Sequence, residues 1–145
     1  MKALIQLVKN ASVKVDQKII SEINYGFLVF LGIKNTDTEE NLRKLADKLI
    51  KLRIFPDEND KMNLSIKDKN AEVLVVSQFT LYADTIGGNR PSFSAAMRPE
   101  EANLLYEKFC DYLETFGITV KRGQFQAMME VELINDGPVT VMIEN

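Results

Sequence analysis

Two continuous apolar runs limit the folds open to this chain more than any other feature. Residues 25–33 (YGFLVFLGI) read as a strand buried on both faces, and residues 71–76 (AEVLVV) begin a second strand. The longest uninterrupted run, 27–31, is far below the roughly 20 residues that cross a bilayer. Shorter strands with nearly alternating apolar positions are predicted at 2–8, 12–16 and 18–23, joined by tight polar turns.

Two amphipathic helices are predicted between these strands. The first begins at a capping box made by Thr36 and Glu39 and ends near Phe55. The second has Pro99 in its first turn and is stopped by Gly117. Their apolar stripes consist of Leu42, Leu45, Leu49 and Leu52 in the first helix and Ala102, Leu105, Tyr106, Phe109 and Leu113 in the second.

The last third of the chain predicts three more strands, at 119–123, 125–134 and 139–143. Residues 135–138 (NDGP) between them read as a turn. The expected fold class is α+β, with residues 1–145 forming one layered domain. Its short β-strands form two sheets or a partly closed barrel, with two α-helices packed on one side.

The sequence contains no histidine, and this absence excludes more kinds of catalytic site than any other feature of the composition. Without it there is no Ser-His or Cys-His nucleophile pair and no usual zinc site, and the single Cys110 permits neither an internal disulfide nor a cysteine metal cluster. We therefore expect no metal and no cofactor. The net charge of −3 and the pI of about 5.1 do not favour broad binding to nucleic acid. The composition indicates a cytoplasmic protein with no membrane or DNA partner.

Two polar segments follow or interrupt predicted strands. Ser77, Gln78 and Thr80 come at the end of the apolar run 71–76, where they either bond to neighbouring backbone or line a site. Thr80 cannot be activated in the usual way because no histidine is present to take its proton. Pro138 lacks a backbone donor and is unusual within a strand, although a structural turn remains the simplest interpretation.

Five motifs are spread over the whole chain: residues 77–84 (SQFTLYAD), 89–93 (NRPSF), 135–140 (NDGPVT), 5–16 (IQLVKNASVKVD) and 52–65 (LRIFPDENDKMNLS). Together they resemble the D-aminoacyl-tRNA deacylase family. The resemblance implies a proofreading hydrolase that cleaves the ester between a D-amino acid and the 3′-terminal adenosine of tRNA. It also implies a homodimer whose partner molecule is the aminoacylated 3′ end of tRNA.

The resemblance assigns roles to individual positions. Ser77, Gln78, Thr80 and Leu81 are expected to line the pocket for adenosine and ester, with Phe79 at the variable position. Gly137-Pro138 is expected to be cis and to reach into the active site of the other subunit, between Asn135 and Thr140. The expected catalytic set is Ser77, Gln78, Phe79 and Thr80, and the expected substrate-binding and chiral-selection set is Gly137, Pro138, Asn135, Met129 and Arg90.

Two positions depart from the family pattern. Leu7 stands where an arginine often helps to fix the Gly-Pro segment, and Gly87-Gly88 stands where a basic residue often precedes a glycine. The expected chemistry uses backbone N–H groups near Phe79 and Thr80, together with the 2′-hydroxyl of the tRNA. A Gly-cisPro backbone wall would reject L-amino acids and admit glycyl-tRNA.

Three alternatives stay open on the sequence alone. The first is a mechanism in which Thr80 attacks the ester directly as a nucleophile, in place of catalysis by the backbone donors and the 2′-hydroxyl. A second is a non-catalytic module that binds a nucleotide or aminoacyl-tRNA. The third is a general esterase, which the missing base disfavours. The identity of the preferred D-amino acids is not fixed by any of these residues.

Overall fold

Eight strands, two α-helices and one short 3-10 helix follow one another along the computed structural model, which describes residues 1–145. The strands are β1 (Lys2–Val15), β2 (Lys18–Ile23), β3 (Gly26–Gly32), β4 (Phe55–Pro56), β5 (Met62–Leu64), β6 (Glu72–Ser77), β7 (Val120–Arg122) and β8 (Glu130–Glu144). The helices are α1 (Glu39–Lys51), α2 (Pro99–Glu114) and the 3-10 helix η1 (Phe79–Tyr82).

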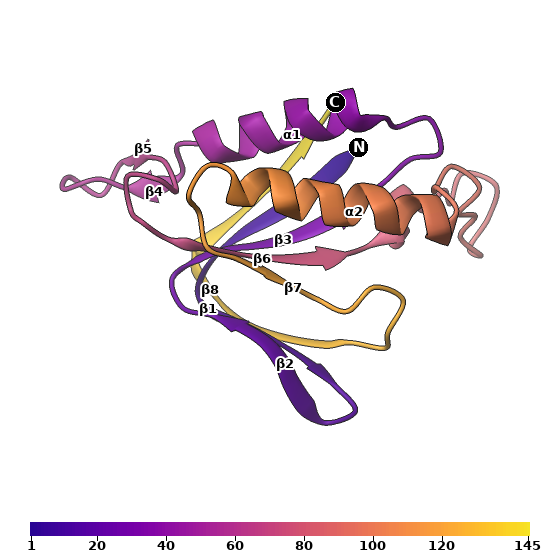
Figure 1. Cartoon of the computed structure of the whole chain (residues 1–145), viewed down its shortest axis with the longest axis horizontal. Helices are drawn as coiled ribbons and strands as arrows, with labels where there is room; N and C mark the ends of the chain where they lie inside the picture. The colour runs from indigo at the N-terminus through magenta and orange to yellow at the C-terminus, as the bar shows by residue number, and fades with distance from the viewer.

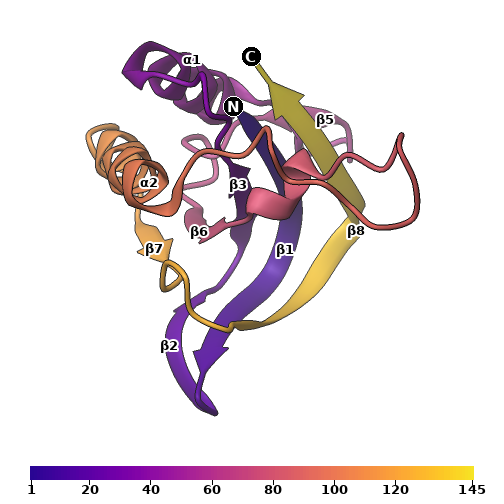
Figure 2. The same ribbon diagram turned by 90° about the vertical axis from the view of Figure 1, so that its right-hand side faces the viewer.

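The long strand β1 organises the main sheet. It pairs antiparallel with β3 along its first half, with β2 along its second half, and with β8 along nearly its whole opposite edge. Strands β3, β6 and β7 are parallel to one another. The sheet curls into a partly closed barrel, and both α-helices lie on one side of it (Figures 1 and 2). This confirms the predicted α+β class.

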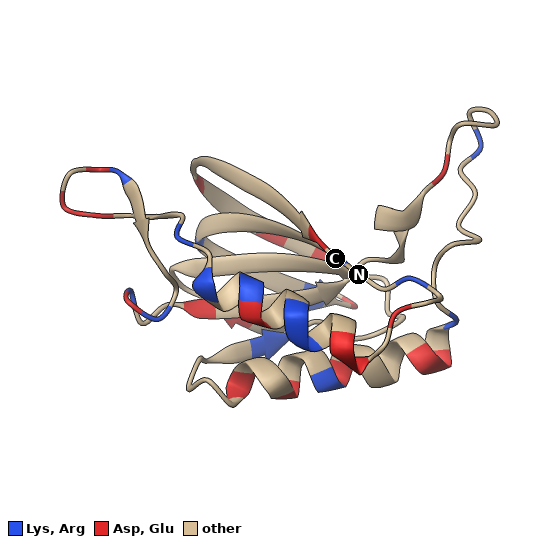
Figure 3. Ribbon diagram, turned by 90° about the horizontal axis from the view of Figure 1, so that it is seen from above, with Lys and Arg blue, Asp and Glu red and all other residues tan.

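The main core lies between the helices and the inner face of the sheet. Helix α1 contributes Leu42, Leu45 and Leu49, as its spacing predicts, and α2 contributes Tyr106, Phe109 and Leu113. The outer faces of the two helices carry acidic and basic side chains intermixed (Figure 3), as is usual for amphipathic helices. No helix is long and apolar enough to cross a membrane.

Strand β3 is buried on both faces, as its continuous apolar run predicts. Phe27, Val29 and Leu31 belong to the main core, whereas Leu28 belongs to a second cluster on the other side of the sheet. The side chains of strand β6 are also shared between the two clusters, so both strands lie in the middle of the molecule. The end of β6 is thereby held rigidly, which matters because the polar segment 77–80 begins there.

Three predicted strand boundaries are wrong. The segments 2–8 and 12–16 are one continuous strand, β1. Residues 135–138 do not break the chain, because β8 runs through them and accommodates the irregularity by shifting its register against β1 near Val8. The strand predicted from residue 125 begins only at Glu130, and residues 123–129 form an irregular segment.

The predicted start of the first helix is also wrong. The residue that caps α1 is Thr38, not Thr36, and the side-chain oxygen of Asn41 accepts the backbone N–H of Thr38 at 3.0 Å. The preceding residue, Asp37, is unavailable to the helix because its carboxylate accepts the backbone N–H of Lys34 at 2.6 Å. A tight turn therefore separates β3 from α1 before the helix can begin.

Candidate active site

A cavity of about 710 Å³ opens beside the end of β6. Its walls come from the ends of β3 and β6, the segment 93–99 leading into α2, and the irregular segment 125–129. It is lined by Leu31, Ile33, Val76, Ser77, Gln78, Phe79, Phe93, Ala96, Met97, Arg98, Pro99, Ala102, Phe125, Gln126, Ala127, Met128, Met129 and Val131. A mostly apolar hollow with a few polar groups at one end is the usual form of a small-molecule site.

The first wall forms where β6 ends and η1 begins. The backbone N–H of Gln78 donates to Leu31 O at 2.8 Å, which extends the pairing of β6 with β3 by one residue. The chain then turns tightly across Gly32. A Cβ on that glycine would lie only 3.0 Å from Leu81 Cβ and 3.1 Å from Gln78 O. Glycine at 32 therefore allows η1 to sit directly against the strand.

Three residues of the expected catalytic set, Ser77, Gln78 and Phe79, line the cavity. Phe79 is 57% exposed and packs edge-on against Phe93, with 5.0 Å between ring centroids. The strand that begins with the apolar run 71–76 ends at Ser77, and η1 follows it, so side chains do not alternate in direction through Thr80. Thr80 does not line the cavity, and its hydroxyl accepts a hydrogen bond from the side-chain amide of Gln78.

The irregular segment 123–129 forms the second wall of the cavity. A buried tyrosine anchors it beside the end of β6. Tyr106 of α2 donates its hydroxyl to Val75 O at 2.8 Å, and the N–H of Gly123 donates to the same carbonyl at 2.8 Å. Burial raises the pKa of Tyr106, so its hydroxyl stays protonated as a donor. A Cβ on Gly123 would lie 2.9 Å from Met129 Sδ, so the glycine lets Met129 pack into the wall.

The cavity has almost no titratable lining. Arg98 is its only charged residue, and no Asp, Glu, Lys, Tyr or Cys side chain lines it. Cys110 lies in the core of α2, where burial raises the pKa of its thiol to about 12 and leaves it unsuited to act as a nucleophile. No group of three or more Cys, Asp or Glu side chains is placed to hold a metal ion. The chemistry available here is that of hydroxyl, amide and backbone groups.

The segment 135–140 is held in shape by the side chain of Asn135. Its oxygen accepts the N–H of Val139 at 2.7 Å, and its nitrogen donates to Val139 O at 3.2 Å and to Thr140 Oγ1 at 3.0 Å. The side-chain amide of Gln6 reaches the same hydroxyl from β1 at 3.2 Å. Leu7 is 2% exposed and lies in the same core cluster as Val139, but its side chain has no hydrogen-bonding group to offer this segment.

Gly137 and Pro138 form an exposed bulge on β8, and the peptide bond between them is cis. Neither residue lines the cavity of its own chain, and Asn135 does not either. Arg90 is exposed in the loop between Asp84 and Ser92 and is likewise separate from the cavity. Within one chain, the structure therefore brings together four of the predicted site residues, Ser77, Gln78, Phe79 and Met129, and leaves the others apart.

Sequence reasoning missed much of the cavity wall. Phe93 belongs to the motif 89–93, and no local pattern marks Met97. The strand predicted at 125–134 begins only at Glu130, so Phe125 and Ala127 lie on the irregular segment beside the cavity. The apolar pattern in 125–129 did signal burial, but its period could not show that these side chains surround a hollow. Arg98 lies in no motif, so the sequence did not mark it as part of the wall.

Comparison with known proteins decides the family. The model of the family described as D-Tyr-tRNA(Tyr) deacylase matches residues 4–144. The chain belongs to this family. A D-aminoacyl-tRNA deacylase from Dictyoglomus turgidum is 56% identical over 144 residues, which cover 99% of this chain and 92% of the relative. One from Exiguobacterium is 51% identical over 144 residues, covering 99% and 98%.

Two solved structures have the same fold. A c-Myc DNA Unwinding Element Binding Protein superposes with a TM-score of 0.94 at 42% identity, covering 100% of this chain and 99% of that one. A probable eukaryotic D-amino acid tRNA deacylase superposes with a TM-score of 0.86 over 99% and 98%, at 17% identity, which shows the shared fold. The D-Tyr-tRNA(Tyr) deacylase family thus accounts for the whole chain, and the protein is a hydrolase of D-aminoacyl-tRNA.

Proposed function

We propose that the cavity holds the 3′-terminal adenosine and the ester of a D-aminoacyl-tRNA, and that residues 1–145 act as one domain in its hydrolysis. Water adds to the ester carbonyl, the C–O bond to the ribose breaks, and a free D-amino acid and a reusable tRNA leave. The observation that carries this proposal is the lining itself: an apolar hollow ends at Ser77, Gln78 and Phe79 with no acidic or basic catalyst among its residues except Arg98.

Such a lining suits the hydrolysis of an ester that is already activated. The oxyanion of the tetrahedral intermediate would be stabilised by the backbone N–H of Phe79, which lines the cavity, and by the N–H of Thr80 beside it, although the Thr80 side chain is engaged by Gln78. Both lie in the first turn of η1, where N–H groups have no acceptor within the helix. Removing one donor of this kind typically costs about 10²–10³ in rate. The ribose 2′-hydroxyl lies beside the ester and would relay the proton.

Chiral selection is assigned to the bulge at Gly137-Pro138, acting on the cavity of a second subunit. Two observations support this. The bulge is exposed and well ordered by Asn135, yet it does not face the cavity of its own chain. A rigid main-chain surface with nothing to contact in its own subunit is suited to complete a site elsewhere.

Assembly gives the first prediction. The purified protein is expected to sediment as a dimer, and a variant that is forced to be monomeric should lose deacylation because no second subunit supplies Gly137-Pro138. Analytical ultracentrifugation together with turnover of D-Tyr-tRNA measures both. A monomer with full activity would rule out the cross-subunit site.

Mixed dimers test the same idea without changing assembly. Gly137→Ala disables the bulge, and Phe79→Glu places a charge in the cavity wall. Subunits of the two variants, each inactive alone, are refolded together in equal amounts. Half of the dimers are then mixed, and each has one intact site. Activity should recover to about a quarter of the unmodified value. No recovery would mean that bulge and cavity act within one chain.

The role of Thr80 gives a second prediction. Because its hydroxyl contacts Gln78 and does not line the cavity, Thr80→Ala should retain turnover within about tenfold of the unmodified enzyme. A nucleophilic threonine would instead lose about 10⁴-fold or more. Single-turnover hydrolysis of D-Tyr-tRNA distinguishes these outcomes, and thermal unfolding of the variant confirms that it is folded.

The tRNA itself is expected to contribute a catalytic group. A tRNA ending in 2′-deoxyadenosine and charged on its 3′-hydroxyl should be hydrolysed about 10²-fold more slowly, which is the lower range for loss of one acid–base group. Its affinity is the control, since a competition assay should show similar binding. Normal turnover of the deoxy substrate would exclude assistance by the 2′-hydroxyl.

The reaction is placed in the cytoplasm, where aminoacyl-tRNA is made and used. The competing possibility is a module that binds an aminoacyl-tRNA without hydrolysing it. One assay separates the two: turnover of D-Tyr-tRNA, L-Tyr-tRNA and a simple tyrosine ester by the same sample. Hydrolysis of the first alone supports the proposal, whereas binding without turnover supports the module. EDTA is expected to leave the rate unchanged.

A further inference from the structure

Arg122 ends strand β7 and is bound by three carboxylates of α2. Its Nη2 donates to Asp111 Oδ1 at 2.8 Å and to Glu114 Oε1 at 2.9 Å, and its Nε lies 3.7 Å from Glu107 Oε2. The three acidic residues are spaced at i, i+4 and i+7, so they share one face of the helix. Strand β7 lies beside α2 (Figures 1 and 2), and Arg122 therefore ties the end of the strand to the helix.

This cluster differs from a single surface ion pair. The Arg122 side chain is 31% exposed, whereas Lys108 and Glu39, which pair between α2 and α1, are 54% and 50% exposed. Ion pairs contribute more when several charges form a network around an arginine than when they are isolated and exposed. Without the cation, carboxylates one turn apart on the same helix would repel one another. Loss of Arg122 is therefore expected to release the end of β7 from α2.

The bound arginine lies directly before the second wall of the cavity, residues 123–129. The N–H of Gly123 donates to Val75 O at 2.8 Å, and Tyr106 donates its hydroxyl to Gly123 O at 3.4 Å. Strand β7 has already ended at Arg122, so Gly123 is the point at which the wall leaves the sheet. Arg122 and Gly123 together fix the direction in which the chain enters the wall.

Residues 124–129 have few contacts of their own to hold them in place. They form one hydrogen bond, from Ala127 N–H to Gln124 O at 3.2 Å. Gln126 has a φ of +62°, which residues with a Cβ rarely adopt. The position of the wall is therefore set largely at its ends, by Arg122 at one end and by the pairing of β8 with β1 at the other.

We propose that Arg122 is a positioning residue of the candidate active site, which fixes the wall 123–129 against the end of β6 and thereby sets the width of the cavity. Arg122 does not line the cavity, so it acts through Phe125 and Met129, which do. That this width governs substrate binding rests on the proposed function, whereas the anchoring of the wall does not.

Amide hydrogen exchange followed by NMR tests the anchoring. In Arg122→Gln the N–H of Gly123 is expected to exchange about tenfold faster or more, because the wall opens without the rest of the molecule. Amides of β3, in the middle of the sheet, serve as the internal reference and should be unchanged. Lys108→Gln, which breaks the pair with Glu39 on the same helix, is the matched control and should leave Gly123 protected. Equal exchange at Gly123 in both variants would overturn the proposal.

Binding is tested with D-Tyr-tRNA. Arg122→Gln should raise KM about three- to tenfold, the range expected when a network of neighbouring charges is broken. The value of kcat should change little, because an apolar wall binds substrate and transition state alike. Lys108→Gln should leave both constants unchanged. An unchanged KM in Arg122→Gln would contradict the positioning role. Absence of turnover by the unmodified chain would instead count against the proposed function, and the exchange at Gly123 would still decide the anchoring.

Substitution of the carboxylates separates anchoring from attraction to the tRNA. The combined variant Asp111→Asn and Glu114→Gln keeps the cation but removes its hydrogen-bonded partners. Anchoring predicts a rise in KM as large as that of Arg122→Gln, and no further rise when all three changes are combined. Direct attraction of tRNA phosphates by Arg122 predicts the opposite, a lower KM once the acidic side chains are gone. A lower KM in the combined variant would therefore overturn the proposal.

Discussion

Gly137→Ala is expected to lower kcat for D-Tyr-tRNA by about 10²-fold while the protein remains folded and dimeric. Gly137 has a φ of +133°, a conformation that residues with a Cβ rarely adopt. A Cβ there would lie 2.6 Å from Val139 Cγ2 and 3.0 Å from Val139 N. The main chain of the bulge must therefore move, and a displacement near 1 Å in a positioning element costs about this much in rate.

The control is a glycine that also has a positive φ but has no role in the site. Gly117, after α2, has a φ of +76°, and a Cβ on it would meet nothing within 4 Å. Gly117→Ala therefore carries backbone strain without displacing neighbours, and should cost stability but leave kcat unchanged. Equal loss of kcat in both variants would show that Gly137→Ala acts through general destabilisation, and full activity of Gly137→Ala would remove the bulge from catalysis.

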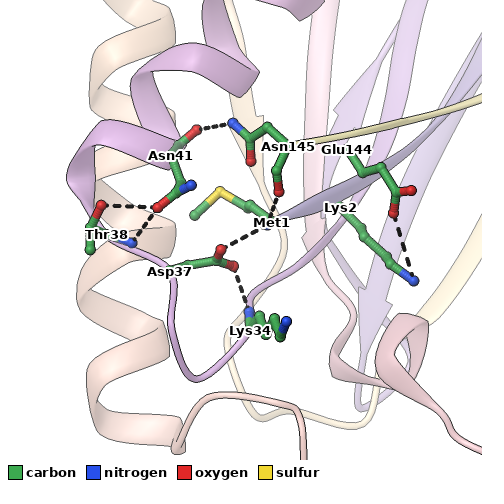
Figure 4. A network of polar contacts seen from close by, with 8 residues as sticks. All are labelled: Met1, Lys2, Lys34, Asp37, Thr38, Asn41, Glu144 and Asn145. Carbon is green, nitrogen blue, oxygen red and sulfur yellow. Dashed lines mark hydrogen bonds and ion pairs between the residues drawn. The ribbon is translucent and has the colours of Figure 1, made fainter.

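Much of the fold could be predicted from the sequence because the strong patterns are local. The spacing of Leu42, Leu45 and Leu49 predicts the apolar stripe of a helix. The unbroken apolar run 25–33 predicts a strand that is buried on both faces. The failures arose where tertiary contacts override local signals. The NDGP segment has turn chemistry, but pairing with β1 on both sides of it keeps β8 continuous. Helix α1 begins at Thr38 and not at the predicted Thr36, because Met1 and Lys34 engage the Asp37 carboxylate in the turn before it (Figure 4).

The candidate site was predictable only in part. The motif at 77–80 stood out because polar residues follow a buried strand, and the structure places three of its residues on the cavity. Thr80 turned away because Gly32 lets the chain curl into η1, which alternation along a strand could not anticipate. The role given to Gly137-Pro138 came from family resemblance, since local physics indicated only a turn.

The second large expected effect concerns handedness. At equal enzyme concentration, D-Tyr-tRNA and D-Asp-tRNA should both be hydrolysed, glycyl-tRNA should be hydrolysed to some degree, and L-Tyr-tRNA should be spared. A pocket that recognised the D side chain would need one shape to suit both tyrosine and aspartate. Excluding the L side chain avoids this requirement, because every L-amino acid places its Cβ in the same direction.

A main-chain wall is suited to this exclusion. Pro138 has a fixed φ and Gly137 has no Cβ, so the backbone of the bulge can approach the α-carbon of the substrate and leave room only for hydrogen. Asn135 holds the bulge through two hydrogen bonds to Val139, which keeps the wall from yielding to an L side chain. A clash of roughly 1–3 kcal/mol against such a surface lowers the rate about 10- to 10²-fold.

Glycyl-tRNA is the substrate that separates exclusion from recognition. It has hydrogen on both sides of the α-carbon, so a wall that only excludes must admit it, whereas a pocket that binds the D side chain would leave it unbound. Asn135→Ala should make the comparison sharper, because a loosened wall is expected to gain activity on L-Tyr-tRNA while retaining activity on glycyl-tRNA. Complete resistance of glycyl-tRNA, or appreciable hydrolysis of L-Tyr-tRNA by the unmodified enzyme, would show that the chiral filter lies elsewhere than at Gly137-Pro138.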